Sequence, residues 1–412
     1  MPPFAAGPVS PRRLVAIVCA AQVLAQIGAY AWPALVPGRM EAWGIDNADA
    51  GWITGLFYLA YAVAVPVLVT LTDRVDPKRV YLFGVAVTVV GHLVFATLAD
   101  GFWSAAFARV LAGVGWAGTY MTGLKLLADR VDDRLMSRAV AGHALSIGLA
   151  GAASFLFAGV LDDLFGWRSV FWGSAACAAA AWLTVALAAP AQPARSEPPA
   201  GRLFDFMPVL RNRSAMAYAI AYCVHTWEMN TLRGWGVAFL VWVAATTGEE
   251  PWLPATAAIT LVGLAGTWAS VAGNEASIRL GRQRLVRAAM LASAVCAAGI
   301  GFLGPVSYSV AVALVLVYGV VIWLDSSSLT AGAAGSALPG RRGATLAVHS
   351  MLGYAGGFAG PLIMGVVLDL AGGMSTLGWG LAFLHVAAAM LVGRVAFAML
   401  RPRALPGDRP GG

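Results

Sequence analysis

Apolar segments of about twenty residues recur twelve times along this 412-residue chain, and this pattern limits the possible folds most strongly. A helix of that length, rising about 1.5 Å per residue, crosses the ~30 Å hydrocarbon core of a bilayer. Only 11% of the residues are charged, against about 25% in soluble proteins. The sequence therefore predicts an all-α integral membrane protein with twelve transmembrane helices. They are expected at 14–35, 51–71, 80–99, 103–127, 139–161, 170–189, 215–240, 255–274, 286–303, 309–331, 344–368 and 377–400.

Basic residues lie almost entirely on one side of the predicted membrane. With the N-terminus in the cytoplasm, the cytoplasmic segments hold 21 Lys or Arg residues, and the opposite segments hold only Arg39 and Arg168. Under the positive-inside rule this bias predicts that both termini lie in the cytoplasm. The expected location is a bacterial inner membrane. The net charge of +7 is then a consequence of topology. Nucleic acid is not an expected partner.

The chain is expected to consist of two six-helix halves. A connection over 188–213, rich in Pro and Ala, separates six predicted spans from six, which gives halves over 1–187 and 214–412 with a cytoplasmic linker between them. An internal repeat supports pseudo-symmetric halves, because spans five and eleven align at a constant offset. The matched pairs are His143 with His349, Gly151 with Gly357, Gly159 with Gly365, and Asp163 with Asp369.

Several function classes find no support in the sequence. The four cysteines lie inside apolar spans, which argues against a disulfide framework or a metal site. No G-x-x-x-x-G-K-[ST] segment is present, so ATP is not the predicted energy source. The histidines are scattered over different spans, without a nucleophile–base pair. We expect neither an enzyme nor a bound cofactor or metal. A non-transporting membrane sensor is the alternative from another class.

The seventh predicted span carries an unusual density of polar side chains. His225, Glu228, Asn230 and Arg233 all lie within it. A charged side chain in hydrocarbon costs about 2.5–3.5 kcal/mol on insertion scales, and such residues usually face a bundle interior or a water-filled cavity. His225 and Glu228 share one helix face. Glu228 is the leading candidate for a proton or substrate ligand, and the structural alternative is a buried Glu paired with Arg233 or His225.

Further candidate residues lie in spans one, four and ten. Asp325 is the second intramembrane acid, and three serines follow it in the sequence. A polar stripe at every fourth residue of span one indicates a water-facing wall, while the aromatic residues of span four have packing against neighbouring helices as their alternative role. These candidates are Gln22, Gln26 and Tyr30 in span one, Arg109, Trp116 and Tyr120 in span four, and Trp323 with Asp325 in span ten.

Two segments resemble signatures of the major facilitator superfamily. The loop TDRVDPKR over 72–79 is similar to the superfamily's G-x-x-x-D-R-x-G-R-[RK], and the segment over 109–115 is similar to its R-x-x-x-G-x-G. Val69 and Asp76 stand where the loop signature has glycines. The resemblance implies a twelve-span secondary transporter, and it implies that the loop latches the outward-open state. The matching loop residues are Asp73, Arg74, Lys78 and Arg79.

These observations predict a monomeric secondary active transporter that moves a small polar or amphipathic organic solute by alternating access. Protons are the predicted coupling ion, because Glu228, Asp325 or His225 can bind and release them within the membrane. The G-P-x-x-G-G segment of superfamily antiporters is absent from span five and has a partial counterpart at Gly360 and Pro361 of span eleven. Proton-antiport efflux of drugs or toxic metabolites therefore stays as the alternative.

Overall fold

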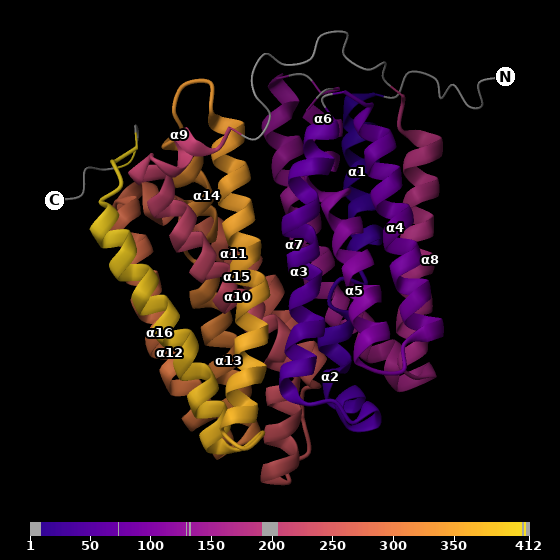
Figure 1. Cartoon of the computed structure of the whole chain (residues 1–412), viewed down its shortest axis with the longest axis vertical. Coiled ribbons are helices and arrows are strands. Elements are labelled where there is room, and N and C mark those ends of the chain that lie inside the picture. Colours follow the sequence, from indigo (N-terminus) through magenta and orange to yellow (C-terminus); the bar gives the residue numbers. More distant parts are fainter. Residues whose placement is uncertain are drawn as a thin grey trace. The chain divides into compact units, whose positions relative to one another are not determined.

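The computed structural model describes residues 10–72, 74–128, 130–131, 133–191, 205–405 and 408 as helices joined by short turns, with no β-strand among them (Figure 1). Asp73 of the predicted gating loop lies outside the described residues. The helices of the first half are α1 (Pro11–Gln26), α2 (Ala31–Trp43), α3 (Asn47–Leu71), α4 (Pro77–Leu98), α5 (Phe102–Ala117), α6 (Tyr120–Ala128), α7 (Asp133–Phe165) and α8 (Trp167–Ala188). They are followed by α9 (Met207–Leu210), α10 (Arg213–Thr247), α11 (Ala255–Leu280), α12 (Arg282–Leu303), η1 (Gly304–Val306), α13 (Tyr308–Trp323), α14 (Ser326–Gly335), α15 (Arg342–Leu370) and α16 (Thr376–Leu400).

Ten helical segments of the described chain are long and apolar enough to cross a membrane. They correspond to all the predicted spans except the fourth and the seventh. The fourth span is divided into α5 and α6, and the seventh is α10, whose 35 residues include the polar stretch. With these two added, the helices account for the twelve predicted spans. The all-α membrane fold class is confirmed.

Side-chain caps determine where several long helices begin. A polar side chain before the first turn accepts a hydrogen bond from a backbone N–H group that has no partner within its helix. The capping residues are Ser10 for α1, Asp76 for α4, Asn212 for α10, Ser307 for α13 and Ser375 for α16. All five precede an apolar run, so the start of each of these helices is determined by residues that are neighbours in the sequence.

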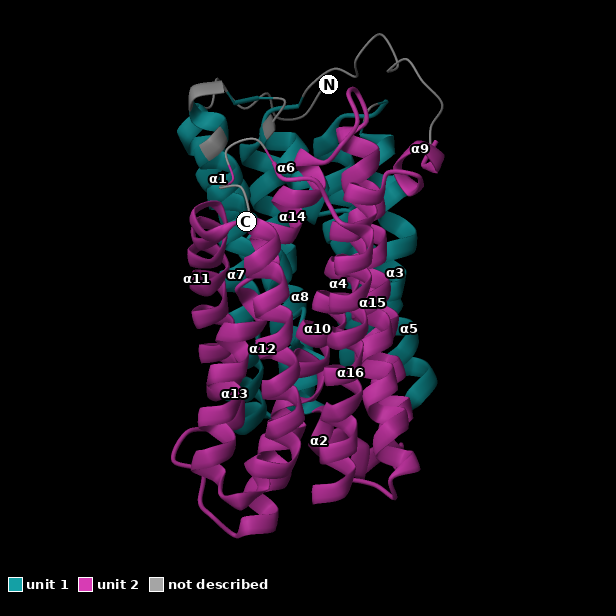
Figure 2. Ribbon diagram, turned by 90° about the vertical axis from the view of Figure 1, so that its left-hand side faces the viewer, with its two compact units in different colours: residues 1–35, 59–203 teal, residues 36–58, 204–412 magenta. Residues whose placement is uncertain are grey.

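Two compact units divide the chain (Figure 2). The first comprises residues 1–35 and 59–203, and the second comprises residues 36–58 and 204–412. The N-terminal part of α3 therefore groups with the second unit, whereas the predicted halves divide the chain at the linker. Below we call these bodies unit 1 and unit 2.

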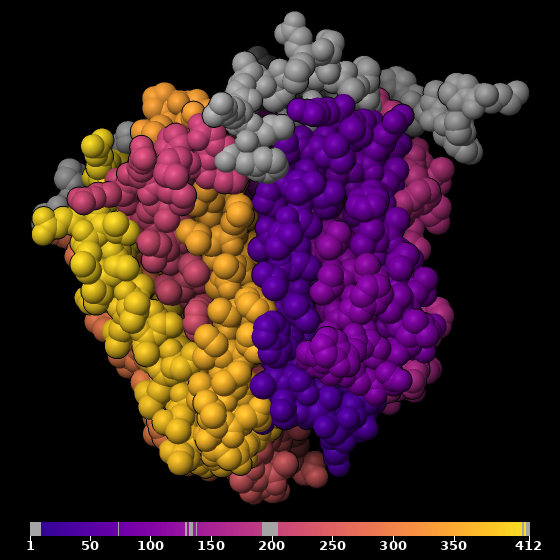
Figure 3. Space-filling view, viewed as in Figure 1, coloured from indigo at the N-terminus to yellow at the C-terminus, as the bar shows by residue number. Residues whose placement is uncertain are grey.

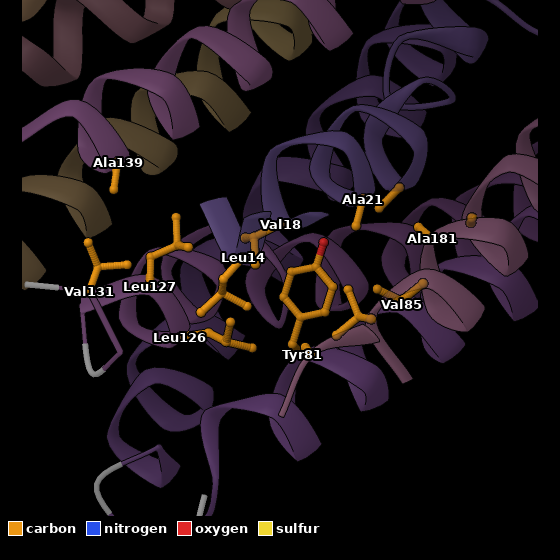
Figure 4. Packing of buried hydrophobic residues seen from close by; sticks show 14 residues of the cluster. Leu14, Val18, Ala21, Tyr81, Val85, Leu126, Leu127, Val131, Ala139 and Ala181 are labelled. Carbon is orange, nitrogen blue, oxygen red and sulfur yellow. The ribbon is translucent and has the colours of Figure 1, made fainter. Parts of the chain in front are cut away.

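In unit 1, helix α4 packs against α5 and α8, and α1 packs against α7 and α8. An apolar cluster lies among α1, α4, α6 and α8, where Tyr81 is surrounded by Leu14, Leu126 and Val85 (Figure 4). All four side chains are at most 2% exposed. Their burial fixes the faces of α1 and α4 that point inward.

In unit 2, helix α10 packs against α15 and α16, and α12 packs along α16. The outward surface of α16, coloured yellow in Figure 3, is apolar. Val392 and Met399 are 68% and 75% exposed, and Trp268 of α11 is 74% exposed. Large apolar side chains are exposed in this way when lipid, rather than water, surrounds the helices.

A carboxylate of α15 holds the start of α3 within unit 2. Asp369 accepts hydrogen bonds from the Asn47 backbone amide at 3.2 Å, from the Asn47 side-chain amide at 2.6 Å and from the Ala48 amide at 2.7 Å. These amides belong to the first turn of α3, where the helix dipole also favours a negative charge. Asp369 thus serves as a cap supplied by a distant helix. The sequence repeat matched this residue with Asp163 but gave no reason for the pairing.

We expect Gly356→Ala to destabilise unit 2, because an added Cβ atom would overlap the backbone carbonyl oxygen of Cys223 in α10. Forcing an extra carbon into a packed helix contact costs about 1–3 kcal/mol. Gly299→Ala is the matched control, since its Cβ would meet nothing nearer than Leu303 Cδ1 at 3.7 Å. Thermal unfolding of the purified variants measures the difference. Equal unfolding temperatures for the two variants would contradict the tight α10–α15 contact.

Removing the carboxylate of Asp369 is expected to lower the free energy of unfolding by about 1–2 kcal/mol, the usual cost of a lost helix cap. The test compares Asp369→Ala with Asp163→Ala, because Asp163 occupies the repeat-related position and is exposed. Denaturant unfolding followed by tryptophan fluorescence provides the measurement. If Asp163→Ala is as destabilising as Asp369→Ala, the capping role assigned to Asp369 is wrong.

Candidate functional site

The two intramembrane acids lie in unit 2, on α10 and at the break between α13 and α14. Because α13 ends at Trp323 and α14 begins at Ser326, Asp325 occupies the N-cap position of α14. Glu228 lies near the middle of α10. Their exposed fractions are 1% for Glu228 and 2% for Asp325. Both side chains are therefore buried in the folded chain.

Asp325 is paired with a histidine that lies far from it in the sequence. His225 Nδ1 is 2.9 Å from Asp325 Oδ1, and both side chains are at most 2% exposed. The two atoms approach as an ion-pair contact, without the alignment of a good hydrogen bond. The contact is an ion pair only when the imidazole is protonated and the carboxyl group is ionised. A single proton therefore decides whether this buried contact is ionic.

Glu228 adds a third titratable group to this region. The Tyr318 hydroxyl of α13 and the Ser293 side chain of α12 face its carboxyl group, although neither makes a hydrogen bond of good geometry with it. Asp325 is also close enough to influence it electrostatically. The structural alternative of pairing with His225 is not realised, because His225 contacts Asp325 instead. We call Glu228, His225 and Asp325 the acidic cluster.

A second histidine continues this region along α10. Tyr222 stacks on His225 at 5.7 Å between ring centroids and on His349 of α15 at 4.0 Å. His349 Nε2 lies 3.3 Å from the Thr330 hydroxyl of α14. The imidazole of His349 is therefore joined to the acidic cluster through one tyrosine ring. The sequence repeat had singled out His349, but the spacing of residues within α15 could not show that this histidine lies beside α10.

The remaining candidates of spans seven and ten have separate contacts. Asn230 Nδ2 donates to the Thr226 carbonyl oxygen at 2.9 Å, so the amide nitrogen of this side chain bonds to the backbone of its own helix. The Arg233 guanidinium carbon lies 4.8 Å from the centre of the Trp323 ring, a cation–π contact. This ring contact joins α10 to the end of α13. The structure thus brings Glu228, His225 and Asp325 together, and it places Arg233 with Trp323.

The candidates of spans one and four gather in unit 1. Arg109 is 1% exposed and donates from Nη1 to the Ala29 carbonyl oxygen at 3.0 Å, so its side chain points into the unit and does not reach the surface. Tyr30 packs edge-to-face on Trp116, with 6.4 Å between the ring centroids. Tyr120 lies parallel to His143 at 6.1 Å. Gln22 and Gln26 are buried on the same face of α1.

The described residues of the predicted gating loop divide into two groups. Arg74 and Arg79 are exposed, whereas Lys78 Nζ donates to the carbonyl oxygens of Ala186 at 2.8 Å and Ala189 at 2.6 Å. These oxygens lie at the C-terminal end of α8, where a cation satisfies carbonyl groups without partners in the helix. Lys78 therefore ties α4 to α8 within unit 1.

Sequence reasoning missed the residue that organises this loop. Asp76, which replaces a glycine of the superfamily signature, caps α4 through the Lys78 amide at 2.9 Å. Its Oδ1 atom also accepts from Arg130 Nη2 at 3.0 Å, with both side chains 5% exposed. Arg130 Nη2 donates further to the Pro190 carbonyl oxygen at 3.1 Å. A proline directly after an acid, here Asp76 and Pro77, is the local signal of such a cap.

Comparisons with known proteins agree with this architecture. The chain is 31% identical over 141 residues to the "Drug efflux pump JefA" of Mycobacterium tuberculosis, an alignment that covers 34% of this chain and 27% of the relative. It is 25% identical over 138 residues to the "Probable sphingolipid transporter spinster homolog 2" of Arabidopsis thaliana, covering 34% of this chain and 28% of that protein. These alignments therefore span about a third or less of each curated relative.

A solved structure covers nearly the whole chain. The crystal structure of the nucleoside transporter NupG matches with a TM-score of 0.75, 14% identity, and coverage of 94% of this chain and 98% of that one. At this identity the match shows the fold alone. The family model described as "Major Facilitator Superfamily" matches residues 18–361. This match, which covers most of the chain, shows that the chain belongs to the Major Facilitator Superfamily, and the helical segments long enough to cross a membrane make it a multi-pass membrane protein.

Proposed function

We propose that this transporter moves a small organic solute by alternating access and that protons drive the movement through the acidic cluster. One observation carries the proposal: Glu228 and Asp325 are both buried in the membrane-spanning part of unit 2, with His225 in contact with Asp325. Burying an ionisable side chain within the membrane costs free energy, and such residues usually mark the pathway of a substrate, an ion or a proton. Protonation of the cluster changes the number of charges that α10 and α14 must bury.

The residues around the cluster support a proton function over a purely structural one. Tyr318 and Ser293 face Glu228 without a well-formed hydrogen bond, so its carboxyl group is not held as a fixed structural ion pair is. In general, water or a nearby cation favours the charged form of a carboxyl group, so a conformational change that alters these surroundings also alters proton binding. This dependence on conformation is what coupling of proton binding to transport requires.

The proposed setting is a bacterial inner membrane with both termini in the cytoplasm and a monomeric transporter. The orientation is supported by the basic residues, nearly all of which lie in the segments assigned to the cytoplasmic side of the membrane. Efflux is the second candidate direction, and its specific support is the 31% identity with a protein named as a drug efflux pump. In that case protons would enter as the solute leaves. The acidic cluster would have the same role in both directions.

The decisive test uses the double variant Glu228→Gln with Asp325→Asn, which keeps the shape of both side chains and removes both titratable groups. A thermal-shift screen of metabolites and drugs first identifies a bound solute, since a ligand of the folded state raises its stability. Proteoliposomes then compare proton-driven accumulation of that solute with its exchange at equal pH. We expect accumulation to be lost while exchange continues, because only coupling needs the protons.

The matched control carries Glu275→Gln with Asp163→Asn, two exposed acids outside the cluster. This control should accumulate solute as the native protein does. Accumulation by the cluster variant at the native rate would overturn the proposal. Loss of exchange as well as accumulation would instead make the acids solute ligands, and measured affinities would then fall in the cluster variant.

A further inference from the structure

Unit 1 contains a polar cluster of its own, formed by Gln22 and Gln26 of α1 and His143 of α7. The three side chains are 0%, 4% and 1% exposed. Helix α1 packs against both α6 and α7, so the cluster lies inside the helical packing of the unit. We call these three side chains the donor cluster.

Gly123 of α6 has no side chain, which lets these side chains approach its backbone closely. A Cβ atom added at Gly123 would lie 2.9 Å from His143 Nε2, 3.2 Å from the Tyr81 ring and 3.4 Å from Gln22 Oε1. Three polar or aromatic groups from α1, α4 and α7 therefore converge on one backbone position of α6. The Tyr120 ring, one turn earlier on α6, lies parallel to the His143 ring.

One nitrogen atom of each side chain in the donor cluster is buried without a hydrogen-bond partner among the described residues. These atoms are Gln22 Nε2, Gln26 Nε2 and His143 Nε2. The two amide nitrogens can only donate, and His143 Nε2 donates in the tautomer that carries its proton there. The Tyr81 hydroxyl donates to Gln22 Oε1 at 3.4 Å, which leaves the amide nitrogen of Gln22 to donate elsewhere. Each buried polar group without a partner costs about 1–3 kcal/mol. Three such groups together indicate a site whose hydrogen bonds are completed by a ligand.

The charges of unit 1 define the ligand's chemistry. Among its described residues, Asp76 is the one buried acid, and its Oδ1 atom is occupied by Arg130. The buried guanidinium of Arg109 adds positive charge to the interior. Within the described part of unit 1, a cationic ligand would find no carboxylate beside Gln22 or Gln26, and a buried charge without a counter-charge is strongly disfavoured. A carboxylate or carbonyl oxygen, by contrast, accepts what amide nitrogens donate.

Aromatic rings lie beyond the C-terminal end of α1. Tyr30, in the turn between α1 and α2, packs on Trp116 and stacks on Phe155 at 5.3 Å. Tyr61 packs edge-to-face on the same Trp116 at 5.8 Å. A flat apolar body fits beside rings of this kind, because aromatic faces and edges attract one another.

We propose that unit 1 binds the transported solute by its hydrogen-bond-accepting end, and that the solute is a flat organic carboxylate or carbonyl compound rather than an amine. Gln22, Gln26 and His143 hold the accepting oxygen atoms, and the Tyr30–Trp116 rings hold the apolar body. The inference rests on the proposed transport function and adds the substrate class to it. It also gives His143 a binding role that the sequence repeat alone did not assign.

The experiment measures binding of benzoate, benzamide and benzylamine to the purified full chain by ligand-induced thermal stabilisation. The three probes share one ring and differ in the charge and hydrogen-bonding of a single group. We expect stabilisation by benzoate and benzamide and none by benzylamine. In Gln22→Glu the added negative charge should weaken benzoate binding about tenfold or more, because a hydrogen bond to a charged group is lost and a repulsion takes its place.

Gln22→Met is the second variant, since it keeps the length of the side chain and removes only the amide. The matched control is Gln283→Glu, the same change at a glutamine of unit 2 that donates to the Pro402 carbonyl oxygen. The control should bind benzoate as the native chain does. Unfolding temperatures measured without ligand identify any variant that has failed to fold. If one Gln22 variant fails to fold, benzoate binding by the other Gln22 variant tests the inference.

Three results would overturn the inference: benzylamine binding as tightly as benzoate, benzoate binding unchanged in the folded Gln22 variants, or no stabilisation by any of the three probes. The last would mean that water completes the hydrogen bonds of the donor cluster. Binding is measured without a proton gradient, so it is separate from the coupling test. Native coupling in the Glu228→Gln, Asp325→Asn variant would defeat the proposed proton role and leave the binding result standing.

Discussion

The buried contact between His225 and Asp325, with Glu228 beside it, is the constraint on which the arrangement of unit 2 depends. Charged groups in hydrocarbon are costly, so the helices that carry them must turn those faces toward one another. Helix α10 does this along its length, with polar groups inward and α15 and α16 packed closely on it. The tight fit at Gly356 follows from the same need, because close packing excludes lipid from the polar face.

The two units solve the problem of buried polar groups in different ways. Within its membrane-spanning helices unit 2 buries the two acids Glu228 and Asp325, which can bind and release protons. Unit 1 buries the neutral donors Gln22 and Gln26, whose hydrogen bonding does not depend on pH in the physiological range. In the proposed mechanism this difference separates proton binding from recognition of the solute's accepting group. The contrast rests on side-chain chemistry within each unit.

Helix ends are held by ionic caps that come from distant parts of the chain. Asp369 of α15 caps the first turn of α3, and Lys78 of α4 satisfies the last carbonyl groups of α8. Asp76 combines both kinds of contact, since it caps its own helix and pairs with Arg130. Such contacts are stronger than neutral hydrogen bonds, and each can break when a helix end moves.

The sequence by itself determined the twelve spans, the helix starts at capping residues and the presence of acids within the membrane. These features depend on local composition and spacing, which a linear pattern contains. It also identified Glu228, His225 and Asp325 individually. Only the tertiary structure decided that His225 pairs with Asp325 and that His143 lies beside Gln22, because these contacts join helices far apart in the chain. A helix's rotation about its own axis sets such partners, and packing against its neighbours fixes that rotation.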